Sequence, residues 1–118
     1  MAYYCGIDIG ASTAKLVVID ASARIMGKAM GRSGIDYAKT AEALLTGVCT
    51  TESLDRSQIT RSLSTGYGRD NVPWADTKMT EIACHGKGAY FYFQQRITVI
   101  DIGAQDSKII HLDDTGKR

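Results

Sequence analysis

The chain has 118 residues, which is enough for one domain, or for one domain and part of another. Its formal net charge is +1, from 14 basic and 13 acidic residues without a basic run, so nothing predicts a nucleic-acid or anionic membrane surface. No apolar stretch has the length of a membrane-spanning helix, and the three widely spaced cysteines are typical of reduced thiols in the cytoplasm.

The first half of the chain predicts three strands followed by a helix. Residues 5–9 and 15–19 are apolar, β-rich runs joined by a turn of small residues, which is typical of a hairpin. Residues 24–31 predict a third, outer strand. Asp36 is a suitable N-cap for a helix that continues to about Thr50. An apolar stripe at helical spacing predicts that this helix packs on the sheet, and its members are Ala38, Ala41, Leu44, Leu45 and Val48.

The second half of the chain predicts a strand, a long helix and a second hairpin. Alternation over residues 59–64 favours a strand, and we expect a helix from about Thr77 to Phe93. Residues 97–102 and 108–112 predict two more strands, and Asp113 to Gly116 is a turn signal. The buried stripe expected on the helix consists of Met79, Ile82, Ala83, Gly86, Ala89 or Tyr90, and Phe93.

The turn of the first hairpin has the composition of a phosphate-binding loop. Residues 10–14 are Gly-Ala-Ser-Thr-Ala, so backbone N–H groups and two hydroxyls can approach an anion closely. Asp8 stands where the first strand ends, beside that anion. Because a carboxylate next to a phosphate needs a cation between them, the pattern predicts a water-coordinated Mg²⁺.

The same pattern returns near the end of the chain. Residues 100–113 align without gaps on residues 7–20, with the core Ile-Asp-Ile-Gly-Ala identical and the lysine and final aspartate retained. Two such loops facing one another could clamp a phosphate chain from both sides. Coincidence between two apolar strands is the alternative, and the repeated offsets of Asp, Gly and Lys disfavour it.

These motifs carry a family resemblance. The two loops resemble the phosphate-1 and phosphate-2 motifs of the actin, Hsp70 and sugar-kinase superfamily. Residues 6–10, 65–69, 81–85 and 101–108, in that order, resemble more closely the BadF/BadG/BcrA/BcrD ATPases. That family includes activators of 2-hydroxyacyl-CoA dehydratases and ATPase subunits of benzoyl-CoA reductase.

The resemblance implies an α/β fold: the ribonuclease H-like first lobe of an actin-like ATPase, with a mixed sheet and helices, plus the first hairpin of a second lobe. We expect the first lobe at residues 1–95 and the incomplete second lobe at 96–118. The implied function is an ATP-binding and ATP-hydrolysing lobe. In the whole enzyme it couples hydrolysis to low-potential electron transfer into a CoA-thioester dehydratase or reductase, and we expect little or no turnover from these 118 residues alone.

The resemblance also assigns roles to individual residues. Asp8 and Asp101 are expected to hold Mg²⁺ through water or to orient the attacking water, and Gln105 to position that water. Lys15 and Lys108 are expected to offset phosphate charge, or to be solvated strand-end lysines. Gly66 is expected in a strand-end loop that points at the ligand, or in an ordinary glycine-rich turn. The remaining residues expected to contact phosphates of ATP or ADP are Gly10, Ala11, Ser12, Thr13, Gly103, Ala104, Gln105, Asp106, Ser107 and Lys108.

Some family features are missing from this sequence. Family members usually have a second glycine where Ala104 stands, and alanine has less freedom at positive φ. The family's iron–sulfur ligands and adenosine motif are expected beyond Arg118, so no cluster is assigned here. Cys84 and His85 are adjacent on a helix and point apart, so a metal site is not expected from them.

Two other functions compete with the ATPase lobe. One is a binding or regulatory module that keeps the phosphate loops without turnover. The other is an assembly role, in which the chain pairs with a separate C-terminal half or with itself as a homo-oligomer. The family resemblance implies the dehydratase or reductase component as a further partner.

Overall fold

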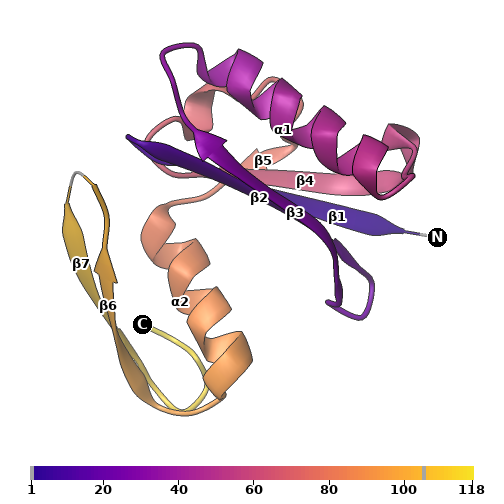
Figure 1. Ribbon diagram of the computed structural model, residues 1–118. Coiled ribbons are helices and arrows are strands. Elements are labelled where there is room, and N and C mark those ends of the chain that lie inside the picture. The colour runs from indigo at the N-terminus through magenta and orange to yellow at the C-terminus, as the bar shows by residue number, and fades with distance from the viewer. Residues whose placement is uncertain (1, 105) are drawn as a thin grey trace. The chain divides into compact units, whose positions relative to one another are not determined.

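The computed structural model describes residues 2–104 and 106–118, which form two compact units. Unit 1 is Met1–Lys78 and unit 2 is Met79–Arg118 (Figure 1). Within the described residues, no helix is both long enough and apolar enough to cross a membrane.

Unit 1 is built on a mixed sheet of five strands in the order β3-β2-β1-β4-β5. The antiparallel pairs β1–β2 and β2–β3 form a meander, and β1–β4 and β4–β5 are parallel. A parallel pair needs a crossover, and the segment between β3 and β4 supplies it with a helix. The strands are β1 (Tyr3–Ile9), β2 (Thr13–Asp20), β3 (Ile25–Arg32), β4 (Ile59–Thr65) and β5 (Thr77–Lys78).

That helix, α1 (Tyr37–Thr51), covers one face of the sheet (Figure 1). It begins where expected, because the Asp36 carboxylate accepts a hydrogen bond from the Lys39 N–H at 3.1 Å. Buried and half-buried residues alternate along β1, so only one face of this strand enters the core. Burial of each large aliphatic side chain contributes roughly 1.5–3 kcal/mol. The core includes Cys5, Ile7, Ile9, Leu16, Val18, Ala41, Leu45 and Val48.

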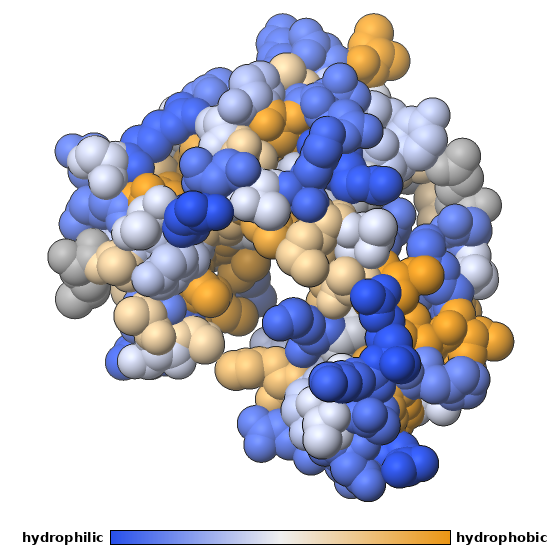
Figure 2. Space-filling model, turned by 180° about the vertical axis from the view of Figure 1, so that it is seen from behind, coloured by the Kyte–Doolittle hydropathy of each residue, from blue (hydrophilic) through white to orange (hydrophobic). Residues whose placement is uncertain are grey.

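Unit 2 consists of α2 (Glu81–Phe93) and an antiparallel hairpin of β6 (Ile97–Ile102) and β7 (Ser107–Leu112). Among the residues of this unit that the structure describes, the buried ones are Gly86 on α2 and Ile110 and Leu112 on β7. A Cβ added to Gly86 would lie 3.4 Å from Leu112 Cδ2 and 3.6 Å from Ile110 Cγ2, so the glycine marks a close approach of helix and hairpin. The opposite side of the hairpin is exposed and apolar, and orange side chains gather over it at the right of Figure 2.

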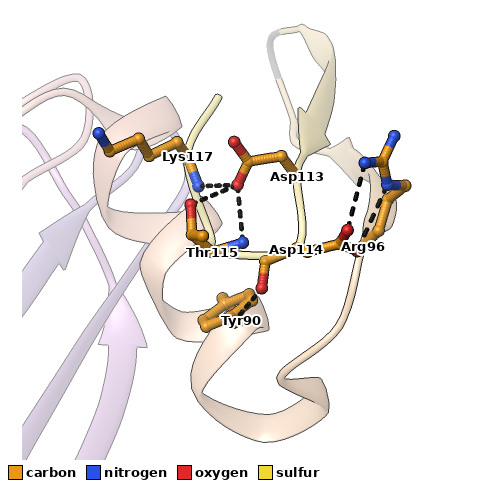
Figure 3. A network of polar contacts seen from close by, with 6 residues as sticks. All are labelled: Tyr90, Arg96, Asp113, Asp114, Thr115 and Lys117. Carbon is orange, nitrogen blue, oxygen red and sulfur yellow. Dashed lines mark hydrogen bonds and ion pairs between the residues drawn. The ribbon is translucent and has the colours of Figure 1, made fainter.

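A tight turn follows β7, as the sequence predicts (Figure 3). The Asp113 carboxylate accepts hydrogen bonds from the N–H groups of Thr115 at 2.8 Å and Lys117 at 3.0 Å. Asp114 binds Arg96 at 3.3 Å, and its carbonyl accepts a 2.7 Å hydrogen bond from the Tyr90 hydroxyl. These contacts tie the turn to the end of α2 and to the start of the hairpin.

The predicted elements are confirmed except around α2. The predicted helix start at Thr77 is wrong, because Thr77–Lys78 forms β5 and Thr80 caps the helix. Asp76 causes the difference: its N–H donates to the Ser62 carbonyl and its carboxylate accepts from the Ser62 N–H, which holds the segment against β4. The prediction that Phe93 belongs to the buried stripe is wrong, since its exposed fraction is 62%. The buried residues of the hairpin, Ile110 and Leu112, lie at Gly86, about two turns earlier in α2.

Candidate functional site

The first predicted loop is a closed turn between β1 and β2. Asp8 and Lys15 are cross-strand partners at its base. The Gly10 N–H donates to the Thr13 carbonyl at 3.0 Å, so this amide closes the turn and does not point outward. Ala11 and Ser12 are exposed at the tip, and Thr13 is the first residue of β2. The exposed residues Ala11 and Ser12, with the half-buried Thr13, are therefore the part of the loop that can meet an anion.

A residue with no predicted role holds this loop in place. Ser33 is fully buried; its hydroxyl donates to the Gly10 carbonyl at 2.6 Å, and its N–H donates to the Ser12 carbonyl at 2.9 Å. Thr40 on α1 in turn donates to the Ser33 carbonyl at 2.7 Å. No motif or periodic pattern in the sequence marks Ser33 as a support for this loop. Its two contacts fix the loop to the segment that leads into α1.

The predicted Gly66 loop lies directly beside Asp8. Asp8 is the parallel partner of Thr65, and the next residue, Gly66, has φ +92°. A Cβ on Gly66 would collide with Asp8 Oδ1 and would lie 2.5 Å from the Ile9 carbonyl oxygen. The Gly68 N–H donates to that carbonyl at 2.9 Å. The backbone of this loop therefore packs against the carboxylate, and Asp8 Oδ1 is buried.

The second predicted loop repeats the first in backbone detail. Asp101 and Lys108 are cross-strand partners, as Asp8 and Lys15 are. The Gly103 N–H donates to the Asp106 carbonyl at 2.8 Å, which is the counterpart of the bond that closes the first turn. The other predicted residues described at this loop, Ala104 and Ser107, are exposed. Gln105, the predicted water-positioning residue, lies outside the described residues.

The side chains around the second loop differ from those around the first. Lys108 Nζ lies 2.9 Å from Asp106 and 3.6 Å from Glu81 on α2, and only 20% of its side chain is exposed. The hydrogen bond to Asp106, with the nearby charges of Glu81 and Asp101, raises the pKa of Lys108. Lys15, by contrast, is an exposed residue. Lys108 is therefore already charge-compensated within unit 2.

The Asp101 carboxylate has a partner that the sequence did not reveal. Its Oδ2 is hydrogen bonded to Nδ1 of His85, which lies on α2. The two side chains are 22% and 29% exposed, respectively. The predicted motif at residues 81–85 therefore supplies contacts to the second hairpin through its first residue, Glu81, and its last, His85.

Metal binding at these loops is limited to few protein ligands. Among residues 2–104 and 106–118, no group of three or more His, Cys, Asp or Glu side chains could hold a metal ion. One carboxylate at each strand end fits Mg²⁺, which keeps several waters and binds through one or two carboxylates plus substrate phosphates. The same donor set does not fit an iron–sulfur cluster. Burial raises the pKa of the Cys5 thiol to about 12, which disfavours a thiolate ligand there.

Comparison with known proteins places these two hairpins in a family. A sequence profile described as the BadF/BadG/BcrA/BcrD ATPase family matches residues 5–118. The chain belongs to this family. The activator of lactoyl-CoA dehydratase from Anaerotignum propionicum is 37% identical over 119 aligned positions, which cover 97% of this chain and 44% of that protein. The chain thus spans less than half the length of the relative.

Solved structures agree with this assignment. The activator of the 2-hydroxyisocaproyl-CoA dehydratase from Clostridium difficile, with bound ADPNP, matches with a TM-score of 0.86 and 32% identity. The match covers 98% of this chain and 42% of that one. A ROK family glucokinase from Streptomyces griseus matches at 15% identity with a TM-score of 0.63, covering 97% of this chain and 45% of that one, which shows a shared fold. The fold is that of the actin-like ATPases and sugar kinases, as expected.

Proposed function

We propose that the chain is the nucleotide-binding part of an activator ATPase of this family. The observation that carries the proposal is that the two hairpins have the same strand register and the same turn-closing hydrogen bond. Each also has an aspartate at the end of its first strand. The ADPNP in the C. difficile activator supports a nucleotide as the ligand. The lobe assignment proposed from the resemblance is 1–95 for the first lobe and 96–118 for the start of the second, although the compact units divide after Lys78.

In the proposed site, each part of the hairpins has a separate task. The backbone amides of residues 11–13 and the hydroxyls of Ser12 and Thr13 bind phosphate oxygens, and the amides of residues 104, 106 and 107 with the Ser107 hydroxyl do the same from the second loop. Asp8 and Asp101 bind Mg²⁺ through water or orient the attacking water. The metal, when bound, offsets the negative charge on the phosphate oxygens. Such a site acts by positioning and electrostatics without a covalent intermediate. Gln105 and Lys15 remain proposed participants.

For the whole protein we propose ATP-driven, low-potential electron transfer to a CoA-thioester dehydratase or reductase in the cytoplasm. The relative named as an activator of lactoyl-CoA dehydratase supports a dehydratase component as the partner. The chain spans 44% of that relative, so hydrolysis by these 118 residues alone is expected to be slow or absent.

Isothermal titration calorimetry on the chain tests phosphate binding. Pyrophosphate should bind more tightly with Mg²⁺ than without it, and Mg–ATP and Mg–GTP should bind about equally, because the contacts are to phosphates. Each charge-assisted contact is worth roughly 1.5–3 kcal/mol. Adenosine binding equal to or tighter than pyrophosphate binding would contradict the proposal. A phosphate-release assay on the same samples separates binding from turnover.

We also propose that the chain self-associates through the outer face of the β6–β7 hairpin. Ile100, Ile102 and Ile109 are 69%, 77% and 65% exposed on this face, and both strands are edge strands of a two-stranded sheet. Multi-angle light scattering should show a species larger than a monomer, and Ile102→Glu should reduce it to a monomer. Ile35→Glu, at a fully exposed isoleucine of unit 1, is the matched control and should change nothing. A monomeric parent chain would refute this proposal.

A further inference from the structure

His85 is the candidate for an additional role, because it holds a carboxylate already assigned to the site. Its Nδ1 is hydrogen bonded to Asp101 Oδ2. An ionised carboxylate can only accept, so Nδ1 carries the proton and donates in this pair. The torsion that turns a carboxylate is broad and roughly two-fold, so a fixed donor on one oxygen restricts it. The second oxygen, Oδ1, is then held in a defined direction.

Contacts made by residues before and after His85 hold this part of α2 against the second hairpin. One helical turn earlier, Glu81 lies 3.6 Å from Lys108, the cross-strand partner of Asp101. The next residue, Gly86, lies close to β7, because a Cβ added to it would be in van der Waals contact with Leu112. Residues four apart lie on one face of a helix, so Glu81 and His85 can both contact the second hairpin, Glu81 at Lys108 and His85 at its partner Asp101.

The first hairpin restrains its carboxylate in a different way. There the backbone of Gly66 packs against Asp8 Oδ1. The second hairpin has no third strand beside it within the described residues, because its sheet is β6–β7 alone. In unit 2 the contact to the carboxylate comes from a side chain of α2 and not from a neighbouring strand.

We propose that His85 is a positioning residue that fixes the Asp101 carboxylate for water-mediated Mg²⁺ binding at the second loop. The inference rests on the proposed function, since it concerns the same Mg–phosphate site. Residues that orient a metal-binding group typically change metal affinity when they are replaced, by about 10- to 100-fold. Because the metal is held through water here, we expect an effect near the lower end of that range.

The test measures how much Mg²⁺ strengthens pyrophosphate binding in three full-chain variants, by calorimetry with and without the metal. His85→Asn places an amide nitrogen near the position of Nδ1 and should keep the Mg²⁺ effect within about twofold of the parent. His85→Gln places its nitrogen nearer Nε2, and His85→Ala has no donor. Both should lose about tenfold of the Mg²⁺ effect, with metal-free binding unchanged. If His85→Ala fails to fold, the Asn–Gln pair decides the question.

The second histidine supplies a matched control. His111 lies on the same hairpin, and its Nδ1 is 3.0 Å from the Thr98 hydroxyl, away from Asp101 in the strand register. His111→Ala should leave the Mg²⁺ effect unchanged. In a double-mutant cycle, His85→Ala should have no further effect once Asp101 is Asn.

The outcomes separate the inference from the function on which it rests. A Mg²⁺ effect in the parent that all three His85 variants keep would overturn the positioning role and leave the proposed function intact. Equal losses in the Asn and Gln variants would show that His85 acts through packing, and would also overturn it. A parent chain with no Mg²⁺ effect would overturn the proposed function, and the inference with it.

Discussion

The two hairpins have the same backbone plan and restrain their aspartates by different means. In β1–β2, Asp8 lies between β2 and β4, and a glycine backbone presses against its carboxylate. In β6–β7, Asp101 lies in a two-stranded sheet, and a histidine from a helix binds its carboxylate. A strand–turn–strand motif therefore specifies where the aspartate stands, while its surroundings decide how firmly the carboxylate is held.

The two lysines likewise share a backbone position but differ in their side-chain contacts. Lys15 and Lys108 occupy equivalent register positions, yet Lys108 is engaged by Asp106 and Glu81 while Lys15 is exposed. Equivalent positions in a repeat can therefore share a place in the strand register and differ in the acidic side chains that surround them. We expect the first lysine to be the more available of the two to an incoming phosphate.

The largest difference between the units should come from replacing one glycine in each, Gly66 beside Asp8 in unit 1 and Gly86 beside Leu112 in unit 2. Gly66→Ala puts a Cβ onto Asp8 Oδ1 at a residue with φ +92°, which should destabilise unit 1 by about 3 kcal/mol or more. Gly86→Ala meets Leu112 at 3.4 Å within a helix, where alanine gains about 1 kcal/mol in propensity, so unit 2 should change little or become more stable. Urea unfolding followed by Trp74 fluorescence reports unit 1, and far-UV circular dichroism reports both units.

Gly47→Ala is the control for helix propensity in unit 1. Gly47 lies in α1, and an added Cβ would have nothing within 4 Å. This variant should be slightly more stable than the parent, by up to about 1 kcal/mol. A Gly66→Ala chain as stable as the Gly47→Ala chain would show that the loop moves away from Asp8 without cost, and the restraint described for the first hairpin would be wrong.

Replacing each aspartate by asparagine should separate binding from stability. Asp8→Asn removes a partly buried charge, so stability should stay the same or rise while Mg²⁺-dependent pyrophosphate binding falls. Asp101→Asn should also weaken binding, and in addition it loses a charge-assisted bond to His85, worth roughly 1.5–3 kcal/mol. Calorimetry and thermal melting measure the two effects. A collapse of the Asp8→Asn fold would make Asp8 a structural residue.

Alkaline pH should weaken unit 1 selectively through Cys5. Burial raises the pKa of this thiol from an ordinary value near 9 to about 12. A group whose folded pKa is raised contributes stability below the unfolded pKa and loses it as pH rises toward the folded pKa. Between those two values the loss is about 1.4 kcal/mol per pH unit. Trp74-detected urea unfolding at pH 8 and pH 10 should show this loss in the parent. Cys5→Ala, which lacks the thiol, should show a smaller pH dependence, and an equal one would contradict the assignment.

The smallest effects are expected from the lysines. Lys108→Met breaks contacts to Asp106 and Glu81 and should destabilise unit 2 by up to about 1 kcal/mol, less at high salt. Lys15→Met should leave stability nearly unchanged and should reduce pyrophosphate affinity more than Lys108→Met does. The opposite order of affinities in calorimetry would reverse the assignment of the two lysines.

The sequence predicted the parts of the molecule that depend on local pattern. Alternation and small-residue turns located both hairpins, and Asp36 located the start of α1. The pairing of Thr77–Lys78 with β4 was missed because it depends on Asp76 reaching Ser62, a contact between distant positions. Ser33 and His85 were missed as supports for the same reason. A buried serine and a helical histidine acquire their roles only from partners that the fold brings together, and no local pattern marks such partners.

The repeated hairpin also makes the molecule its own reference for local dynamics. The pentapeptide Ile-Asp-Ile-Gly-Ala occurs at residues 7–11 and again at 100–104, at the same positions of the two hairpins. Chemical exchange of an amide hydrogen depends on its own side chain and the preceding one, and these are the same in both copies for the last four amides. Where each amide opens and recloses faster than it exchanges, the ratio of rates for matched amides therefore gives the difference in opening free energy directly, without a peptide standard. The copy in the central strand of the larger sheet should exchange more slowly.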